Sequence, residues 1–277
     1  NHVGLIFDLV MMFSAFPIAF AAISRALWLP LLLALLGIFA RGIGFAFRKY
    51  AAGAVRQQAL FGAIFAFAST STPFFFGACA GAIAAGIPVN ERGQFTGDHL
   101  AVWTRPLAIF CAFYAVGLCS YIAAIFMCRE SEIEDDNVLI EKWRKRALTM
   151  GVVLGVFSGL GLVLVAQEAP KLWTGFRSSG LPFVLASSAA GVLSMALVWK
   201  SGFAPAVAAA SVTVATVILG WGAAQYPLLI PPTLTIETTK APDAILWAMA
   251  IAIAGGAVVL IPSLGWLLFL FKRRTAE

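Results

Sequence analysis

The chain has 277 residues, of which 61% are hydrophobic and 12% are charged, and its mean hydropathy is +0.92. An ordinary soluble domain carries roughly 25% charged residues, and no soluble fold hides so much apolar surface. The composition therefore excludes a soluble enzyme and a nucleic-acid-binding domain, and it indicates a polytopic membrane protein. The net charge of +6 fits this class, because basic residues gather in the loops on one side of a membrane.

A helix of about 20 residues crosses the ~30 Å of hydrocarbon in a bilayer, and windows of this length predict about eight transmembrane helices. The fold class we predict is all-α, a polytopic transmembrane helical bundle without a β-sheet. The predicted spans are residues 3–23, 27–47, 59–86, 106–128, 147–167, 181–199, 204–224 and 244–271. With alternating spans, twelve of the 19 Lys and Arg residues fall on one side, six on the other and Arg41 inside a span. The positive-inside rule then places residue 1 and the C-terminus in the cytoplasm.

The first predicted span begins directly at the start of the chain. Neither a Met nor a basic segment precedes Asn1 and His2, whereas a signal peptide carries positive charge ahead of its apolar stretch. We therefore expect the sequence to lack its amino end.

The second predicted span contains a charge that needs an explanation. Arg41 follows an apolar run that extends from residue 26 to residue 40. An unpaired arginine at the centre of a bilayer costs at least about 2.5–3.5 kcal/mol. Gly37, Arg41, Gly44 and Arg48 recur at helical spacing, so the four residues share one face of the helix.

Three explanations for the charge of Arg41 within a span remain open. If the first two spans form a hairpin that turns at residues 24–25, Asp8 and Arg41 lie at one depth, and an ion pair between them is the first hypothesis. The second hypothesis is that the guanidinium reaches the cytoplasmic interface near Arg48. The third is that a cofactor, a lipid or another subunit supplies the partner.

Small residues recur at four-residue spacing in two later spans. Gly77 and Gly81 form one such face, and Gly151, Gly155 and Gly159 form another. Faces of this kind let helices approach closely in lipid. They predict tight packing, either within the chain or against a partner subunit.

Two connecting segments have distinctive compositions. Residues 129–146, RESEIEDDNVLIEKWRKR, form a charged cytoplasmic connector in which Leu139 and Trp143 share a helical face. A short interfacial helix and a solvated linker both fit this segment. The loop at 227–242 begins with three prolines, and we expect it to pack over the outer face. Neither segment is a soluble domain, so residues 1–277 are predicted to form a single integral membrane domain.

Few residues in the chain carry chemistry. There are two histidines and four cysteines, with no CxxC spacing, and no Walker loop, HExxH or GxSxG motif is present. Each haem iron needs one or two axial ligands, usually His, and two histidines near span ends cannot serve several haems. We therefore expect neither a haem nor a metal site in this chain.

Several segments follow one another in the order found in a known family. Residues 1–23, NHVGLIFDLVMMFSAFPIAFAAI, contain an Asn-x-Val and an Ala-Phe-Pro pattern, and residues 41–50, RGIGFAFRKY, contain Arg-Gly-x-x-Phe-x-x-Arg. Similar segments follow at 73–89, 103–110, 121–130 and 219–236. Together they resemble subunit II of cytochrome bd-type quinol oxidases, including the cyanide-insensitive branch, over nearly the whole chain.

The resemblance implies a haem-free subunit made of two bundle-like halves. Its partner, subunit I, would carry haems b and d and oxidise quinol while O₂ is reduced to water with protons from the cytoplasm. The resemblance also implies a multi-pass protein of the bacterial inner (cytoplasmic) membrane. The resemblance implies further partners, namely membrane lipid, quinol and a small accessory subunit. It implies no binding of nucleic acid. The family's first helix, followed by a carboxylate-bearing stretch on a proton route, would precede Asn1.

The resemblance also assigns candidate site residues by matched position. Arg41 and Arg48 fall on the family's two arginines, and Asn1 falls on its asparagine. In some members this neighbourhood borders a bound structural quinone or a proton-conducting cavity. Asn1, Arg41 and Arg48 are therefore the candidate cofactor-binding residues, and Asp8 with Arg41 is the candidate proton-path or ion pair. The alternative function is a secondary transporter with a midplane Asp8/Arg41 site, which would need no partner subunit.

Overall fold

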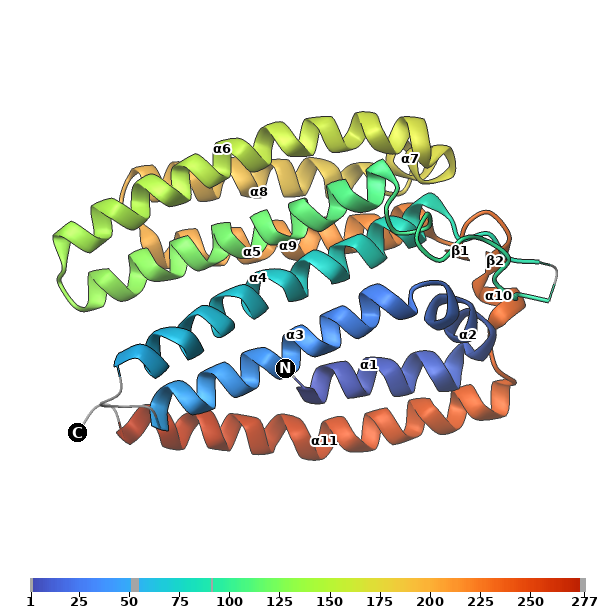
Figure 1. Cartoon of the computed structure of the whole chain (residues 1–277), viewed down its shortest axis with the longest axis horizontal. Helices are drawn as coiled ribbons and strands as arrows, with labels where there is room; N and C mark the ends of the chain where they lie inside the picture. The colour runs from blue at the N-terminus through green and yellow to red at the C-terminus, as the bar shows by residue number, and fades with distance from the viewer. Residues whose placement is uncertain (1, 51–54, 91, 275–277) are drawn as a thin grey trace. The chain divides into compact units, whose positions relative to one another are not determined.

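A computed structural model of the chain describes residues 2–50, 55–90 and 92–274 (Figure 1). The chain divides into two compact units, a smaller one of Asn1–Ala21 with Ile236–Glu277 and a larger one of Ala22–Thr235. The boundary between them falls inside α2 (Pro17–Ala26) and again just after β2 (Leu234–Thr235).

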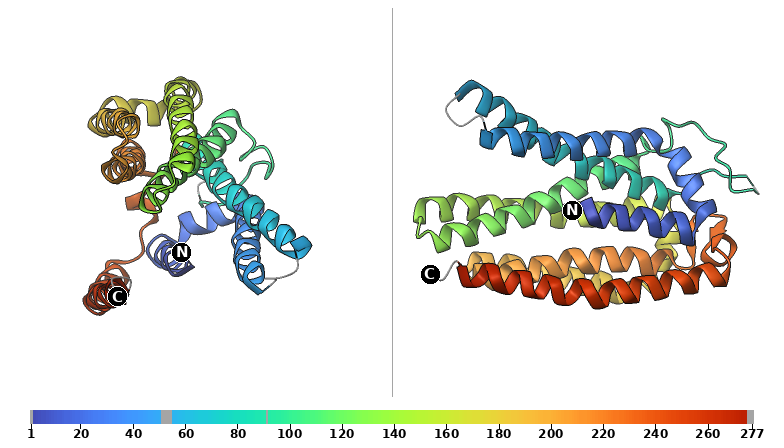
Figure 2. Two further views of the ribbon diagram at one scale, coloured as in Figure 1. Left: turned by 90° about the vertical axis from the view of Figure 1, so that its left-hand side faces the viewer. Right: turned by 90° about the horizontal axis from the view of Figure 1, so that it is seen from below.

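The larger unit consists of helices that run antiparallel to their neighbours. Its other elements are α3 (Trp28–Tyr50), α4 (Val55–Ala85), α5 (Pro106–Ile133), α6 (Asn137–Glu168), α7 (Pro170–Arg177), α8 (Leu181–Trp199), α9 (Phe203–Gln225) and β1 (Leu228–Ile230). Helices α3, α4, α5 and α6 pack in sequence, α8 packs on α9, and α9 also contacts α5 (Figure 2). The all-α polytopic membrane fold predicted from the sequence is confirmed.

Seven helices of the described residues are long and apolar enough to cross a membrane, namely α3, α4, α5, α6, α8, α9 and α11 (Asp243–Arg274). The sequence predicted about eight spans. The prediction that the first of them is a single helix is wrong. Residues 3–23 are divided between α1 (His2–Ala15) and α2, which begins at Pro17. Proline has no backbone N–H and its ring clashes with the preceding turn, so the helix ends before it and a new one begins at it.

The expectation of no β-sheet is wrong at one place. Strands β1 and β2 pair antiparallel, with Leu228 opposite Thr235 and Ile230 opposite Leu234. The prolines between residues 227 and 232 account for the difference, because proline removes a helical donor and favours an extended conformation in the residue before it. The loop predicted at 227–242 therefore begins with a short hairpin.

Polar and close contacts hold this hairpin against the helices of the larger unit. The side-chain amide of Gln225 donates to the Leu229 carbonyl at 2.9 Å, and Lys171 Nζ donates to the Pro232 carbonyl at 2.9 Å. Gly86, with φ of +92°, lies so close that a Cβ added there would meet the Pro231 carbonyl oxygen at 2.8 Å. Glycine adopts this φ at no steric cost, so both its conformation and its size are required here.

The charged segment 129–146 is the tip of a helical hairpin. Helix α5 continues to Ile133 and α6 begins at Asn137, so the segment contains the ends of two long helices and no separate interfacial helix. Asp135 adopts φ of 55° after α5, and the Asp136 N–H bonds to the Ser131 carbonyl at 3.0 Å. This is the Schellman pattern of helix termination. The Asp136 carboxylate then accepts from Leu139 N at 2.9 Å and caps α6.

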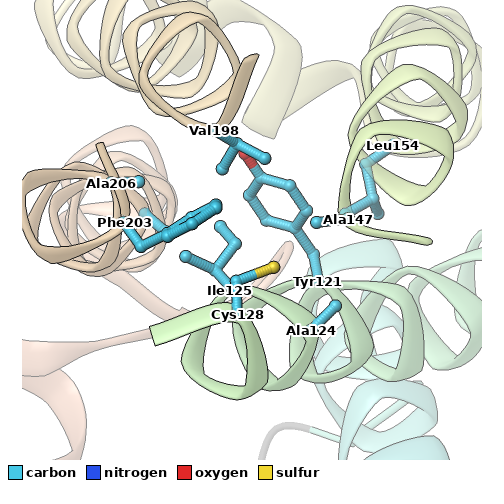
Figure 3. Packing of buried hydrophobic residues seen from close by; sticks show 10 residues of the cluster. Tyr121, Ala124, Ile125, Cys128, Ala147, Leu154, Val198, Phe203 and Ala206 are labelled. Atoms are coloured by element: carbon cyan, nitrogen blue, oxygen red, sulfur yellow. The ribbon is translucent and has the colours of Figure 1, made fainter. Parts of the chain in front are cut away.

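A cluster of buried side chains joins α5, α6, α8 and α9 (Figure 3). The ring of Tyr121 projects from α5 between Leu154 of α6 and Val198 of α8. Its hydroxyl donates to Ser194 Oγ at 2.9 Å, and Ser194 in turn donates to the Ala206 carbonyl at 3.2 Å. Interhelical hydrogen bonds of this kind contribute about 0.6 kcal/mol each in membranes, and this chain of bonds fixes the positions of three helices.

Glycines permit the close approach of α4 to α5. A Cβ added at Gly81 would meet Ala108 Cα at 2.6 Å, and one added at Gly77 would meet Ala112 Cα at 2.8 Å. The face formed by Gly77 and Gly81 therefore packs within the chain. The glycines of the second predicted face differ in their surroundings. A Cβ added at Gly151 would meet Met195 at 2.9 Å, whereas one added at Gly155 or Gly159 would meet nothing within 4 Å.

The smaller unit joins the two ends of the chain. It contains α1, α10 (Ile236–Thr239) and α11, and α1 contacts α11. The Ala241 N–H donates to the Ala15 carbonyl at 2.8 Å. Just before α11, Lys240 Nζ lies 2.8 Å from a Glu237 oxygen and 3.5 Å from an Asp243 oxygen. The hydrogen bond to Glu237 and the charge of Asp243 raise the pKa of Lys240.

The glycine contacts between α4 and α5 predict a difference between two substitutions in one helix. Gly81→Ala should lower the free energy of unfolding by about 1–3 kcal/mol, because the added methyl group has no space. A Cβ added at Gly62 would meet nothing within 4 Å. Gly62→Ala should therefore leave the free energy of unfolding unchanged or raise it by up to about 1 kcal/mol through helix propensity. Thermal unfolding of the purified chain in detergent measures both. Equal stability of the two variants would contradict the predicted packing.

Candidate functional site

Two glycines bring α3 against α4. A Cβ added at Gly37 would meet Thr72 Oγ1 at 2.5 Å, and one added at Gly44 would meet the Phe61 carbonyl oxygen at 3.0 Å. Both glycines are buried. The two glycines of the face predicted for Gly37, Arg41, Gly44 and Arg48 therefore form an interface within the chain by close backbone approach.

Arg41 lies at the edge of this interface. On an ideal helix it is rotated by about 40° from Gly37, and its side chain is exposed. Its guanidinium carbon lies over the ring of Phe65 on α4, 5.5 Å from the ring centroid. A cation–π contact contributes about 0.5–1 kcal/mol at exposed sites and about 2 kcal/mol when desolvated. Since an arginine at the bilayer centre costs at least about 2.5–3.5 kcal/mol, Phe65 alone does not offset that cost.

The hydroxyl groups on α4 next to this interface bond within their own helix. Ser71 and Thr72 both donate to the Ala68 carbonyl, at 3.3 and 2.9 Å, in the back-bonding pattern common for these residues. Ser69 Oγ is buried without a hydrogen-bond partner. In the described part of the larger unit, the ion pairs join Glu141 to residues 144 and 145, and none involves Arg41.

The remaining predicted site residues lie on different parts of the chain. Arg48 is exposed near the end of α3, seven residues and about 10 Å along the helix axis from Arg41. Asp8 is exposed on α1 in the smaller unit, whereas Arg41 belongs to the larger one, so the Asp8–Arg41 pair stays a prediction. Asn1 lies outside the described residues.

Glu168 has a role that sequence reasoning missed. Its Oε2 accepts a hydrogen bond from Leu107 N at 3.0 Å, at the first turn of α5. Arg105, at the N-cap position, makes no capping bond with its side chain and instead donates to the Gly86 carbonyl at 3.3 Å. A carboxylate at this end of a helix satisfies an unpaired N–H and interacts favourably with the helix dipole. Glu168 at the end of α6 thus caps the start of α5.

One signal in the sequence could have indicated this cap. Pro106 is typical of the first position of a helix, and the residue before it, Arg105, is not a capping type. The pattern therefore shows that a cap is missing locally, although it does not show which distant carboxylate supplies it.

Comparison with known proteins identifies the family. The model of the family described as "Cytochrome bd terminal oxidase subunit II" matches residues 1–271.

The chain belongs to this family.

A solved structure agrees in fold with this bd oxidase subunit II family member. The structure of bd oxidase from Geobacillus thermodenitrificans is similar with a TM-score of 0.74 at 20% sequence identity, and the match covers 98% of this chain and 81% of that chain. A likeness at this identity shows the fold, while function depends on individual sites. A search of curated proteins finds no match.

Substitutions of Glu168, which caps α5, should lower the stability of this subunit II by amounts that depend on what the new side chain retains. Glu168→Gln should cost about 0.3–1 kcal/mol through lost charge, and Glu168→Ala about 1–3 kcal/mol because the Leu107 N–H loses its acceptor. Glu132→Ala, at an exposed position near the other end of α5, should change stability by less than about 0.5 kcal/mol. Thermal unfolding and hydrogen exchange at the Leu107 amide measure the effect. Unchanged exchange at Leu107 in Glu168→Ala would show that the cap is not formed.

Proposed function

We propose that the chain is the haem-free subunit II of a quinol-oxidising terminal oxidase in a bacterial cytoplasmic membrane. The observation that carries this proposal is the family match over residues 1–271. The composition supports it, because two histidines in the whole sequence cannot ligate the several haems that such an oxidase uses. The haems b and d and the quinol-oxidising site would then belong to subunit I.

In this proposal, the chain supports catalysis without a catalytic centre of its own. Quinol is oxidised at subunit I, O₂ is reduced to water there, and the protons consumed come from the cytoplasm. Subunit II stabilises subunit I by covering part of its membrane-facing surface. Its helix pairs provide a fixed surface for this purpose, because Gly44 of α3 packs closely on α4 and Gly81 of α4 packs closely on α5.

Arg41 would supply a fixed positive charge to the complex. It is exposed on α3, and Phe65 is too weak a partner to hold a guanidinium in hydrocarbon. An anionic or carbonyl group must therefore approach it from outside the α3–α4 pair. A bound quinone, for which the family pattern also offers Asn1 and Arg48, or a carboxylate such as Asp8 has the required chemistry.

Co-purification tests the proposed function directly. A tagged chain expressed in a bacterium with its partner gene should co-purify with a haem-bearing subunit that shows haem b and d absorbance and quinol oxidase activity. The chain purified alone should be colourless. If no haem-bearing subunit co-purifies with the tagged chain after mild solubilisation, the proposal is wrong.

Substitution of Arg41 tests the role of its charge in the assembled oxidase. Arg41→Gln should lower quinol oxidase activity or haem content about tenfold, which corresponds to the loss of one charge-assisted hydrogen bond. Arg41→Lys should retain an intermediate level, because it keeps the charge and loses the planar fork. Arg56→Gln, at an exposed position near the start of α4, is the matched control and should behave as the wild type. An Arg41→Gln complex equal to that control would show that Arg41 has no role in the oxidase.

A double-mutant cycle identifies the partner of Arg41. If Asp8 is that partner, Asp8→Asn and Arg41→Gln will be non-additive in haem content and thermal stability. Additive effects would assign the partner to a quinone or another subunit. The secondary-transporter alternative requires the chain alone to move a solute in proteoliposomes, and such transport without a pigmented partner would favour it over the oxidase proposal.

A further inference from the structure

Arg41 carries a charge inside the membrane, and the described part of the chain offers no opposite charge to it. Its guanidinium carbon lies 5.5 Å from the centroid of the Phe65 ring, and the ion pairs among the described residues do not include it. Ionisable residues within spans normally pair with one another or face a water-filled cavity. A group beyond these contacts must therefore supply the counter-charge.

The register of α3 on α4 fixes the depth of Arg41. Gly37 lies opposite Thr72, because a Cβ added at Gly37 would meet Thr72 Oγ1 at 2.5 Å. The two helices run antiparallel, so Arg41, four residues further along α3, lies level with about residue 68 of α4. The lipid phosphates lie beyond Arg48, which is about 10 Å further along the axis of α3.

Cys119 of α5 lies at nearly the same depth as Arg41. A Cβ added at Gly77 of α4 would meet Ala112 Cα at 2.8 Å, and α4 and α5 also run antiparallel. Cys119, seven residues after Ala112, is therefore level with about residue 70 of α4. The Arg41 guanidinium is close enough to the Cys119 thiol for an electrostatic interaction, and both side chains are exposed.

The side of α4 between α3 and α5 carries small residues at this depth. They recur at helical spacing and share one face, namely Gly62, Ala66, Ser69 and Pro73. Phe65, which Arg41 contacts, borders this face, since it is rotated by about 40° from Ser69 on an ideal helix. A Cβ added at Gly62 would meet nothing within 4 Å. Small side chains let a second helix approach closely in lipid, so this face has room for one.

A carboxylate suits Arg41 better than a neutral group does. A carbonyl group carries only a partial charge, whereas a carboxylate cancels the full charge of a guanidinium and accepts two parallel N–H bonds from it. A carboxylate is itself unfavourable in hydrocarbon and occurs where a cation faces it. At the depth of Arg41, a protein segment that brings such a group from outside the chain is a membrane-spanning helix.

We infer that the α4 face between Arg41 and Cys119 receives a transmembrane helix of the partner subunit, and that an Asp or Glu of this helix pairs with Arg41. The carboxylate lies beside Cys119, and the small residues of α4 let the two helix backbones approach. This inference rests on the proposed function, because it needs a partner in the membrane. It adds the face that makes the contact and the chemistry of that contact.

Alkylation of Cys119 by N-ethylmaleimide tests the contact. Cys119 should react in the purified full chain in detergent and about tenfold more slowly in the complex with the haem-bearing subunit, as expected for a face that is covered in about nine of ten molecules. Cys79 and Cys128 are buried and should stay unlabelled in both samples. Arg41→Gln should raise the rate at Cys119 in the complex again, because the charge pair is lost.

A cysteine on another helix serves as the matched control. Val156 is 59% exposed on α6, away from Arg41. Val156→Cys in a Cys119→Ala chain should react at the same rate in the free chain and in the complex. Slower reaction that occurs only at Cys119 would support the inferred face.

A carboxylate built into this chain tests the charge pairing. Cys119→Asp supplies the counter-charge internally, so it should raise the Tm of the isolated chain by about 2–4 °C over the isosteric Cys119→Asn, the shift expected for one ion pair in a protein of this size. It should also lower the yield of the haem-bearing subunit in co-purification, because Arg41 is already paired. In an Arg41→Gln chain, Cys119→Asp should instead lower the Tm.

The outcomes separate this inference from the proposed function. If no haem-bearing subunit co-purifies, both are wrong. If the complex forms and Cys119 reacts as fast as in the free chain, the proposed function stands and the inference is wrong. Slower reaction of Cys119 when a short-chain quinone is added to the isolated chain would assign the site to a quinone and overturn the inferred helix. Loss of the slower reaction in an Asp8→Asn complex would assign the carboxylate to this chain and overturn it too.

Discussion

Close approach between helix backbones is the constraint on which the larger unit depends. In a bilayer, lipid tails are as apolar as leucine side chains, so apolar contact between helices gains little over contact with lipid. Association then rests on dispersion contacts and a small number of hydrogen bonds. Gly44 on α3 and Gly81 on α4 allow the dispersion contacts, because they leave no side chain between adjacent helices. The hydrogen bonds include the one from Tyr121 to Ser194, which joins α5 to α8, and the one from Ser194 to the Ala206 carbonyl, which joins α8 to α9.

The same constraint explains the position of Arg41. A helix whose glycine face is used by its neighbour has no space for a guanidinium within that interface. The side chain therefore lies at the edge, where Phe65 contacts it and where an external group is able to approach. A membrane-spanning arginine with so weak an internal partner is expected in a subunit of a larger complex, and membership of the bd oxidase subunit II family agrees with this expectation.

Polar chemistry gathers instead at the ends of the helices. Glu168 caps α5, the Asp136 carboxylate caps α6, and Lys171 reaches the hairpin that follows α9. Backbone groups at helix ends lack partners within the helix, and at these two ends a carboxylate supplies the acceptor, Asp136 from the N-cap of α6 itself and Glu168 from a different helix.

The sequence by itself determined the all-α membrane class, most of the spans and the family, because apolar run length and ordered motifs are local properties of the chain. It also identified Arg41 as anomalous and Gly77 with Gly81 as a packing face. Only the tertiary structure decided that Pro17 divides the first span, that residues 228–235 form a hairpin and that Gly155 and Gly159 lie open. It also decided that Glu168 caps α5 through the N–H of Leu107, which lies 61 residues earlier in the chain. These features depend on which distant segments meet, and helical periodicity shows which face of a helix is small or polar without showing what that face contacts.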